Sequence, residues 1–430
     1  MVASHPPSRP AAPSESAAPG ASAAPDSAAH GAPARPVVRL RPKAEARAIR
    51  HGFPWVYADE LVMDRRSSNL APGTLAVLED AERRPLGLVT VNPASKIVAR
   101  MLDRDPGAAI DQAWFAARLA RALALRARLY EAPFYRLVHA EADGLPGVVI
   151  DRFGAVAVVQ PNAAWAEAHL APLVAALVAV TGVETVIKNG SGRARGLEGL
   201  AEETGVIHGP APEGPVPVAM NGAVYMADLM GGQKTGLFFD QRENHALAAR
   251  LARGARVLDV FSHVGGFALA ALAGGAESAL AVDASAAALD LARRGAGAMG
   301  RDAAFQTRQG DAFATLEALG QEGAVFDLVI CDPPAFAPAK PALEAGLRAY
   351  ERVARLAAPL VAPGGYLVLC SCSHAADLSA FRNASARGIG RGGRRGQLIW
   401  TGFAGPDHPV LPQLAESGYL KALAFRLDGA

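Results

Sequence analysis

The sequence predicts an α/β protein whose C-terminal part, from about residue 213 to residue 430, is an open, doubly wound sheet. Short and nearly continuous apolar runs alternate there with Ala-rich helical patterns. Strands that are apolar on both faces and alternate with helices are typical of a parallel sheet with helices on either side. The apolar runs occupy residues 256–261, 279–282, 326–330 and 366–370.

Two smaller units are expected ahead of this sheet. Residues 36–104 contain short strand patterns and little helical pattern, which indicates a β-rich domain. Residues 105–212 mix helices and strands, which indicates a central α+β domain. In this domain helices are expected at 113–130 and 164–180, and strands at 147–151, 156–160 and 184–188.

Composition narrows the class of protein. Residues 1–35 are almost entirely Ala, Pro, Ser and Gly, so we expect a disordered tail without enough large apolar side chains to fold. The longest apolar runs fall short of a membrane span, and three cysteines form neither a disulfide framework nor a zinc motif. We therefore expect a cytoplasmic protein with no membrane and no metal partner. The oligomeric state stays open, a homodimer included.

A strand, a tight turn and a helix start follow one another over residues 257–267. Asp259 lies in the strand, Phe261 ends it, and Gly265 allows close approach of a ligand at the helix start, so these three residues are candidates for binding a cofactor. The dinucleotide fingerprint G-x-G-x-x-G is missing, which disfavours a nicotinamide dehydrogenase. A ligand with a ribose and no pyrophosphate, such as S-adenosylmethionine (SAM), suits this loop better. An ordinary strand–helix turn is the other interpretation.

Three acidic residues follow later strands of the same pattern. Asp283 ends the second strand, where a carboxylate can accept from ribose hydroxyls. Asp311 follows a strand expected at 304–307 and could accept from an adenine amino group, although a solvated acid is the plainer interpretation. Asp332 is followed by two prolines that keep the chain extended where ligands bind in such sheets. Asp332 could accept from a base amino group or orient the target.

The next strand ends in a cysteine-containing loop. Cys370 is interpreted as a core residue. Cys372 lies beyond the strand, where a thiolate could reach the ligand-binding pocket expected at this edge of the sheet. From the residues alone, Cys372 is either an inert cysteine or a nucleophile. The stretch 231–244 contains a Lys-Thr pair after glycines, but neither the glycine spacing nor a preceding strand fits a phosphate-binding loop.

Taken together, these motifs resemble the ribosomal large-subunit cytosine-5 methyltransferase family with an N-terminal PUA domain. The resemblance covers nearly everything from Pro36 to the C-terminus. Its carrying segments are residues 52–57, 141–147, 232–242, 261–267, 332–336, 372–374, 407–410 and 419–421.

The resemblance implies a fold, a reaction and a set of site residues. The expected fold is a class I methyltransferase domain, a Rossmann-like doubly wound sheet, preceded by a PUA-like RNA-binding domain and the central α+β domain. SAM is the implied cofactor and ribosomal RNA the implied partner. Cys372 is the implied nucleophile, which attacks carbon-6 of the pyrimidine and makes carbon-5 nucleophilic. The residues implied near the cofactor or the target are Gln241, Phe261, Gly265, Asp283, Asp311 and Asp332.

The sequence departs from the family pattern at several positions. His263 stands where the family often has Tyr. Gly295 stands where Asn usually follows the Arg-rich end of a helix. Residues 387–396 are rich in Gly and Arg where a helix is expected. Ala335 replaces the second cysteine of related two-cysteine enzymes, so the base that removes the carbon-5 proton is unidentified.

Two other functions stay open at this stage. An RNA N-methyltransferase would use the loop after Asp332, but such enzymes place an aromatic residue directly after Asp-Pro-Pro, and here Ala335 precedes Phe336. A non-catalytic RNA-binding protein would keep only a vestigial pocket. Because the net charge is only +2, RNA contact is expected from clusters of basic residues. The candidates are Arg39, Arg41, Lys43, Arg47 and Arg50, and a second group of Arg391, Arg394 and Arg395.

Overall fold

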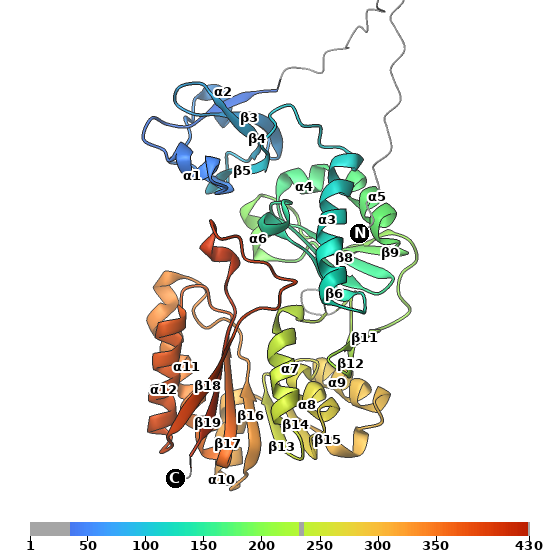
Figure 1. The fold of residues 1–430 in the computed structure, drawn as a ribbon, viewed down its shortest axis with the longest axis vertical. Helices are drawn as coiled ribbons and strands as arrows, with labels where there is room; N and C mark the ends of the chain where they lie inside the picture. Colours follow the sequence, from blue (N-terminus) through green and yellow to red (C-terminus); the bar gives the residue numbers. More distant parts are fainter. Residues whose placement is uncertain (1–34, 232–235, 429–430) are drawn as a thin grey trace, which may run out of the picture. The chain divides into compact units, whose positions relative to one another are not determined.

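Three sheets of five, five and seven strands, with one two-stranded hairpin, organise the part of the chain that the structure describes (Figure 1). The computed structural model describes residues 35–231 and 236–428, and the compact unit begins at Pro36. The tail expected over residues 1–35 therefore lies outside the described residues, apart from Arg35. So does the 232–235 part of the rejected phosphate-loop motif.

The first sheet is antiparallel except for its β1–β3 pair and has the order β1-β3-β4-β5-β2. Two short helices accompany it, and Asp64 caps the second by accepting from the backbone N–H groups of Arg66 and Ser67. Val38, Leu78 and Val89 lie in its core. The elements are β1 (Val37–Arg39), α1 (Ala46–Arg50), β2 (Trp55–Tyr57), α2 (Arg65–Ser68), β3 (Thr74–Glu79), β4 (Pro85–Val91) and β5 (Ile97–Asp103).

The second sheet has the order β10-β9-β8-β7-β6 and packs against two long helices. The single helix expected over 164–180 is wrong, because the structure has two helices that meet at His169. Pro172 lacks an N–H and so cannot continue the hydrogen-bond ladder across this point. The elements are α3 (Gln112–Leu129), β6 (Phe134–His139), β7 (Val148–Phe153), β8 (Val156–Pro161), α4 (Ala164–Ala168), α5 (Leu170–Thr181), β9 (Thr185–Lys188), α6 (Arg193–Leu197) and β10 (Gly205–His208).

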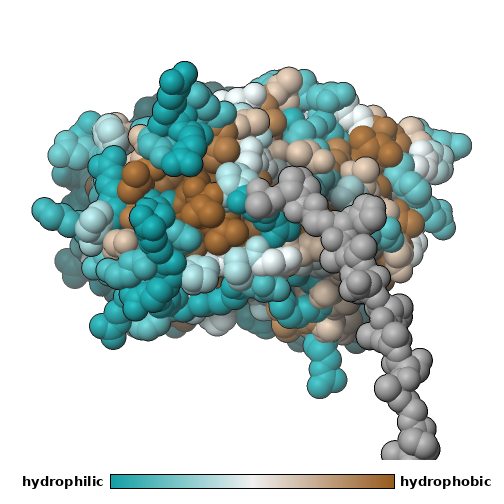
Figure 2. All heavy atoms as spheres, turned by 90° about the horizontal axis from the view of Figure 1, so that it is seen from above, coloured by the Kyte–Doolittle hydropathy of each residue, from teal (hydrophilic) through white to brown (hydrophobic). Residues whose placement is uncertain are grey.

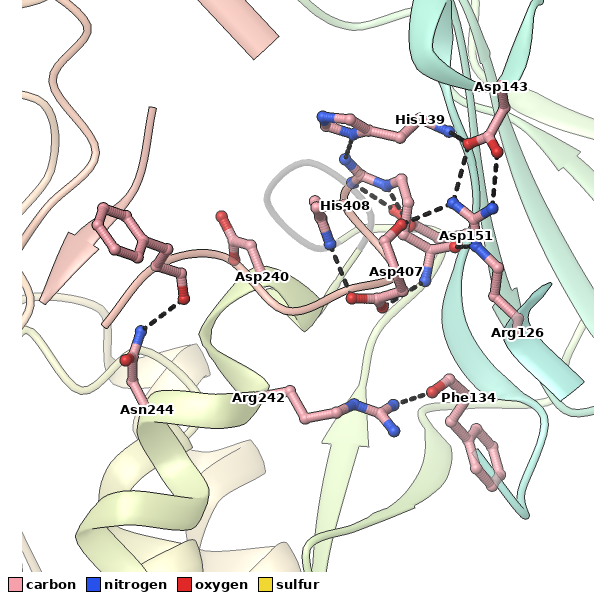
Figure 3. A network of polar contacts seen from close by, with 12 residues as sticks. Arg126, Phe134, His139, Asp143, Asp151, Asp240, Arg242, Asn244, Asp407 and His408 are labelled. Carbon is pink, nitrogen blue, oxygen red and sulfur yellow. Dashed lines mark hydrogen bonds and ion pairs between the residues drawn. The ribbon is translucent and has the colours of Figure 1, made fainter. Parts of the chain in front are cut away.

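Two motifs that the sequence singled out form a buried polar junction (Figure 3). The fully buried Arg126 binds both carboxylate oxygens of Asp143 at 2.7 and 2.8 Å and donates to the backbone carbonyl of Asp407. Asp407 in turn accepts from the backbone N–H of Arg136 and contacts His408. The segments 141–147 and 407–410 therefore join the second sheet to the C-terminal chain.

The third sheet has the order β15-β14-β13-β16-β17-β19-β18. Its first five strands are parallel, and β19 and β18 are antiparallel additions at one edge. Its strands are β13 (Arg256–Val260), β14 (Ser278–Asp283), β15 (Phe305–Gln309), β16 (Phe326–Cys331), β17 (Val361–Ser371), β18 (Gly396–Gly402) and β19 (Lys421–Leu427).

Helices cover both faces of this sheet, which is the predicted α/β fold. Neighbouring residues of a strand enter opposite cores: Val257 belongs to one apolar cluster and Leu258 to the other. The helices are α7 (Arg242–Leu251), α8 (Gly266–Ala273), α9 (Ala286–Ala298), α10 (Ala312–Gln321), α11 (Leu343–Ala357) and α12 (Leu378–Arg391), and the hairpin β11 (Val216–Met220) with β12 (Ala223–Ala227) packs on the α8–α9 side.

The Gly/Arg-rich segment 387–396 differs from its sequence-based interpretation. Helix α12 continues to Arg391, and Gly388 lets α12 approach α11 so closely that a side chain there would meet the Glu351 carbonyl oxygen. Arg394 was expected at the RNA surface, but it is buried, and its guanidinium donates to backbone carbonyls of Ala358 and Asp428. Arg394 is therefore a structural residue.

The surface mixes apolar and polar side chains. Figure 2 shows one face on which brown apolar patches are bordered by teal hydrophilic residues. Within the described residues, no helix is long and apolar enough to cross a membrane.

Candidate active site

A cavity of about 680 Å³ opens at the edge of the third sheet where its parallel strands end. Its volume lies in the range of small-molecule sites, roughly 300–1,000 Å³. Six of the predicted site residues line it. They are Gln241, Phe261, Asp283, Asp311, Asp332 and Cys372.

The loop between β13 and α8 forms one wall of the cavity under backbone strain. Phe261 has a φ of 64° and His263 a φ of 50°, left-handed values that non-glycine residues rarely adopt. Such residues gather at functional sites when the surrounding structure holds them in place. The Oγ of Ser262 is buried in this wall and has no hydrogen-bond partner among the described residues.

Asp283 and Asp311 lie beside this loop. The Asp283 carboxylate accepts from the backbone N–H groups of His263 and Ser285, both at 2.8 Å, which fixes it at the cavity wall. Asp311 caps helix α10 by accepting from the Ala314 N–H at 2.9 Å, a role that the sequence analysis did not consider. A capping carboxylate keeps further lone pairs, so the cap leaves Asp311 able to accept from a ligand.

Two of the predicted cofactor residues do not line the cavity. Asp259 is fully buried beneath the loop and accepts from the Ala268 N–H at the start of α8. Burial raises the pKa of its carboxyl to about 7. Gly265 is needed for its φ of 80° and for packing, because a side chain there would meet Ala292 and Leu269. Both residues shape the loop from below.

The half of the cavity that is lined by Phe261, Asp283 and Asp311 fits an adenosyl group that carries a polar chain. The Asp283 carboxylate suits ribose hydroxyls, Asp311 suits an amino group, and the orphaned Ser262 hydroxyl can pair with a polar ligand atom. Neutral and aromatic side chains, Phe261 among them, provide the apolar wall that a base requires.

The other half of the cavity lies at the ends of β16 and β17. Asp332 follows β16, and its backbone N–H donates to the Val260 carbonyl, so the strand pairing continues to this residue. Pro333, Pro334 and Ala335 then line the cavity. Phe336 turns away and packs among Phe313, Phe261 and Tyr350 with ring centroids 5.0–6.4 Å apart.

The residues on either side of Cys372 are held rigidly. Ser371 and Ser373 are buried, and their hydroxyls share the hydroxyl of Tyr350 at 2.9 and 2.7 Å. The Lys421 ammonium donates to the backbone carbonyls of Ser373 and Ala376, both at 2.7 Å. Cys372, between the two serines, is partly exposed and lines the cavity.

The other two cysteines are poor nucleophiles. Cys331 and Cys370 are buried, and burial raises the pKa of both thiols above the usual range, with the Asp332 charge adding to the effect. A thiol that stays protonated reacts slowly. Cys372 is therefore the cysteine that is partly exposed and lines the cavity, and its expected role as the nucleophile stays a prediction.

Sequence reasoning missed several residues that line the cavity. Asp240 precedes Gln241 in a short 3-10 turn, Tyr419 precedes β19, and His245 lies on α7. The Tyr419 hydroxyl donates to the Asp240 carboxylate at 2.6 Å. Both residues stand in segments that carried the family resemblance, which was the available signal. Burial lowers the pKa of His245 to about 3, so its ring is neutral.

Comparison with known proteins agrees with this geometry. Residues 210–393 match the family described as S-adenosylmethionine-dependent methyltransferase, and residues 38–104 match a PUA-like domain. The ribosomal RNA large subunit methyltransferase of Deinococcus radiodurans is 37% identical over 413 residues, which cover 92% of this chain and 100% of the relative. Ribosomal RNA large subunit methyltransferase I of Erwinia tasmaniensis is 35% identical over 394 residues, 90% of this chain and 98% of the relative.

Solved structures share the fold at lower identity. A Streptococcus mutans structure described as a SAM-dependent methyltransferase is 20% identical, with a TM-score of 0.76 over 91% of this chain and 100% of that chain. A methyltransferase solved with S-adenosylhomocysteine has a TM-score of 0.77, 20% identity and the same coverage. From the family matches and the identity to the curated relatives, the chain belongs to the ribosomal RNA large subunit methyltransferase family and is a SAM-dependent methyltransferase with an N-terminal PUA-like domain.

Proposed function

We propose that this enzyme transfers the methyl group of SAM to carbon-5 of a cytosine in large-subunit ribosomal RNA through a covalent adduct with Cys372. The observation that carries the proposal is the position of Cys372, which is partly exposed in the same cavity as Asp283 and Asp332 while the other two thiols are buried. We infer the RNA class from the relatives, which are ribosomal RNA large subunit methyltransferases.

In this proposal, one half of the cavity binds SAM and the other half binds the target base. Asp283 stands three strand positions from the Cys372 loop in the order β14-β13-β16-β17, roughly 14 Å at the usual strand spacing. We assign Asp283, Asp311 and the loop of Phe261 to SAM, and Asp332 and Cys372 to the target base. Gln241 also lines the cavity and is oriented by Asn244, whose amide donates to its Oε1 at 2.7 Å.

The residues of the chain then perform the following steps. The Cys372 thiolate adds to carbon-6 of the cytosine, which makes carbon-5 nucleophilic. Asp332 accepts from the exocyclic amino group and holds the ring in place. When bound, SAM supplies the electrophilic methyl group for carbon-5. Loss of the carbon-5 proton then expels the thiolate and restores the aromatic ring. Lys421 fixes the Cys372 loop through the Ser373 and Ala376 carbonyls and places a positive charge near the thiolate.

Trapping the adduct tests the proposal. Large-subunit RNA transcribed with 5-fluorocytosine is incubated with enzyme and SAM and run on a denaturing gel. Because the fluorine at carbon-5 does not leave as a proton does, the adduct should persist in the wild type and be missing in Cys372→Ala. The control Cys331→Ala removes a buried thiol and should still form the adduct. Full methylation of ordinary RNA by folded Cys372→Ala would refute the carbon-5 mechanism.

The nitrogen-methylation alternative is disfavoured by the position of Phe336. An aromatic residue that stacks a target base has to face the cavity, and Phe336 packs instead against Tyr350 and Phe313. Digestion of the methylated RNA to nucleosides distinguishes the two products, because 5-methylcytidine and an N-methylated nucleoside separate by chromatography. A methylated nitrogen in that digest would favour the alternative.

For RNA contact we propose the basic residues of the first domain that are not held by acids. Arg39 and Arg50 form ion pairs with Glu79 and Asp80. Arg41, Lys43 and Arg47 are exposed around α1. In the second group, Arg394 is buried, and Arg391 is exposed but pairs with Glu351, so Arg395 is the exposed residue of this group for which no acidic partner is found among the described residues.

Salt dependence of RNA binding tests this assignment. Each phosphate contact that is lost reduces the slope of log K against log salt by about 0.7–0.9. Neutralising Arg41, Lys43 and Arg47 together should therefore flatten the slope by about 2–3. The same number of substitutions at Arg348, Arg352 and Arg355 on α11 serves as a control. An unchanged slope in the first variant would show that these side chains are only solubilising surface.

A further inference from the structure

We propose that Asp240 is the base that accepts the carbon-5 proton and that Tyr419 positions its carboxylate. The inference rests on the proposed carbon-5 mechanism and supplies the step for which the sequence offers no residue. After methyl transfer, carbon-5 carries both a methyl group and a hydrogen. The C5–H bond must break, its electron pair forms the C5=C6 double bond, the C6–Sγ bond breaks, and Cys372 leaves as a thiolate. The proton passes to the Asp240 carboxylate.

The first support is the state of the Asp240 carboxylate. Asp240 is 9% exposed and lines the cavity. Its Oδ2 accepts from the Tyr419 hydroxyl at 2.6 Å, whereas its Oδ1 is buried and has no hydrogen-bond partner among the described residues. An unsatisfied carboxylate oxygen is costly to bury, which makes its persistence at a cavity wall indicative of a ligand or a reacting group. Figure 3 shows Asp240 beside the polar junction of Asp407.

The second support is the register of β19 against β17. These strands are antiparallel, so β19 begins at the edge where β17 ends, and Lys421 is paired with Ser371. Tyr419 and Leu420 therefore lie next to the Cys372 loop, and both line the cavity. The Tyr419 ring also lies 5.5 Å from the ring of His374. Tyr419 thus connects the Cys372 loop with the Asp240 carboxylate.

The other acids and bases that line the cavity are less well placed to accept the carbon-5 proton. Asp283 ends β14 and Asp311 follows β15, on the far side of β13 from Cys372. His245 lies against Phe267 with a ring distance of 4.5 Å, and burial lowers the pKa of its ring to about 3, which makes it a weak base. The Tyr419 phenol is no base itself, because burial and the neighbouring Asp240 charge raise its pKa well above the usual value. Asp332 remains as the competing base, and the experiment separates it from Asp240.

The test uses the full-length enzyme, tritium-methyl SAM and ordinary large-subunit RNA from cells that lack the protein. If Asp240 removes the proton, the Asp240→Asn variant should still form the bond between Cys372 and the cytosine and transfer the methyl group. It should then fail to release the product. A protein–RNA adduct that carries tritium should then accumulate on a denaturing gel, while release of 5-methylcytidine falls roughly 100-fold or more. Tyr419→Phe should show the same adduct with a smaller rate loss, and Asp332→Asn should show none.

Controls separate folding, addition and elimination. Glu243→Gln changes an exposed carboxylate on α7 and should behave as wild type. SAM affinity measured by calorimetry reports the fold of each variant, and trapping with 5-fluorocytosine should proceed in Asp240→Asn as in wild type. Wild-type turnover by Asp240→Asn, or a slow variant that binds SAM but accumulates no labelled adduct, would overturn the assignment to Asp240. If instead wild type gives no 5-fluorocytosine adduct, the proposed carbon-5 mechanism fails, and the assignment fails with it.

Discussion

The assignment of Asp283 to the ribose of SAM is open to a quantitative test with Asp283→Asn. The carboxylate accepts from two backbone N–H groups, those of His263 and Ser285, so alanine would leave both donors without a partner and disturb the loop. Asparagine has nearly the same shape, keeps one acceptor oxygen and removes the charge. The substitution therefore tests the charged hydrogen bonds to a ligand with the least damage to the strained turn at Phe261.

The expected loss follows from the nature of these bonds. Hydrogen bonds to a charged acceptor contribute about 1.5–3 kcal/mol, so SAM should bind roughly 10–150-fold more weakly. Titration calorimetry measures the dissociation constants directly. The matched control is Asp290→Asn, an exposed carboxylate on the neighbouring helix α9, for which no change is expected.

A ribose-deoxy analogue of the cofactor makes the test specific. The wild type should lose affinity for the analogue, whereas Asp283→Asn should bind analogue and cofactor more nearly alike, because the two changes remove the same contact. Additive losses would mean that Asp283 acts through the loop and not on the ribose. Unchanged affinity of a folded Asp283→Asn for SAM would refute the assignment outright.

Three further predictions concern charge and stability. Lys421→Met removes the charge beside the Cys372 loop and should slow alkylation of Cys372 by iodoacetamide at neutral pH, measured by mass spectrometry; an equal rate would show that Lys421 only braces the loop. Arg126→Met leaves the buried Asp143 carboxylate without its partner and should lower the free energy of unfolding by about 3–5 kcal/mol in denaturant titrations; a loss below 1 kcal/mol would contradict the role given to the polar junction. Burial raises the pKa of the Asp259 carboxyl to about 7. The preference of the folded protein for the protonated carboxyl therefore stabilises the fold fully below the unfolded pKa near 4, and this stabilisation is lost as the pH rises through 7. Between pH 4 and pH 7 the free energy of unfolding should fall by about 4 kcal/mol from this group, and Asp259→Asn should remove that fall. If the free energy of unfolding of the variant changes with pH as steeply as that of the wild type, the raised pKa is contradicted.

The parts of the fold that were predictable are those in which one physical constraint dominates. The parallel strands of the third sheet are buried on both faces, so they appear in the sequence as apolar runs such as 326–330. Because parallel strands end at one edge, the acids at or just after these ends, Asp283, Asp311 and Asp332, could be expected to share a cavity, and all three line it.

Residues whose role depends on distant packing could not be assigned in this way. Arg394 belongs to a Gly/Arg-rich run that reads as solvated surface, yet backbone carbonyls of segments more than 30 positions away hold it in the interior. Asp259 and Gly265 stand in the cofactor motif, but they support the loop from below. The sequence gives the type of such a residue and its neighbours, but not the direction in which the fold turns its side chain.

The pairing of Asp240 with Tyr419 shows how the antiparallel edge strand completes the site. The two residues are 179 positions apart, and neither follows a parallel strand of the third sheet. Because β19 is antiparallel to β17, it begins where β17 ends, so Tyr419 enters beside the Cys372 loop on the side away from β16. A shift of one residue in the β17–β19 register would turn the strand's side chains to the opposite faces of the sheet and withdraw Lys421 from the carbonyls that it binds. The register of β19 therefore sets the position of Tyr419 relative to Cys372, and with it the geometry that we propose for removal of the carbon-5 proton.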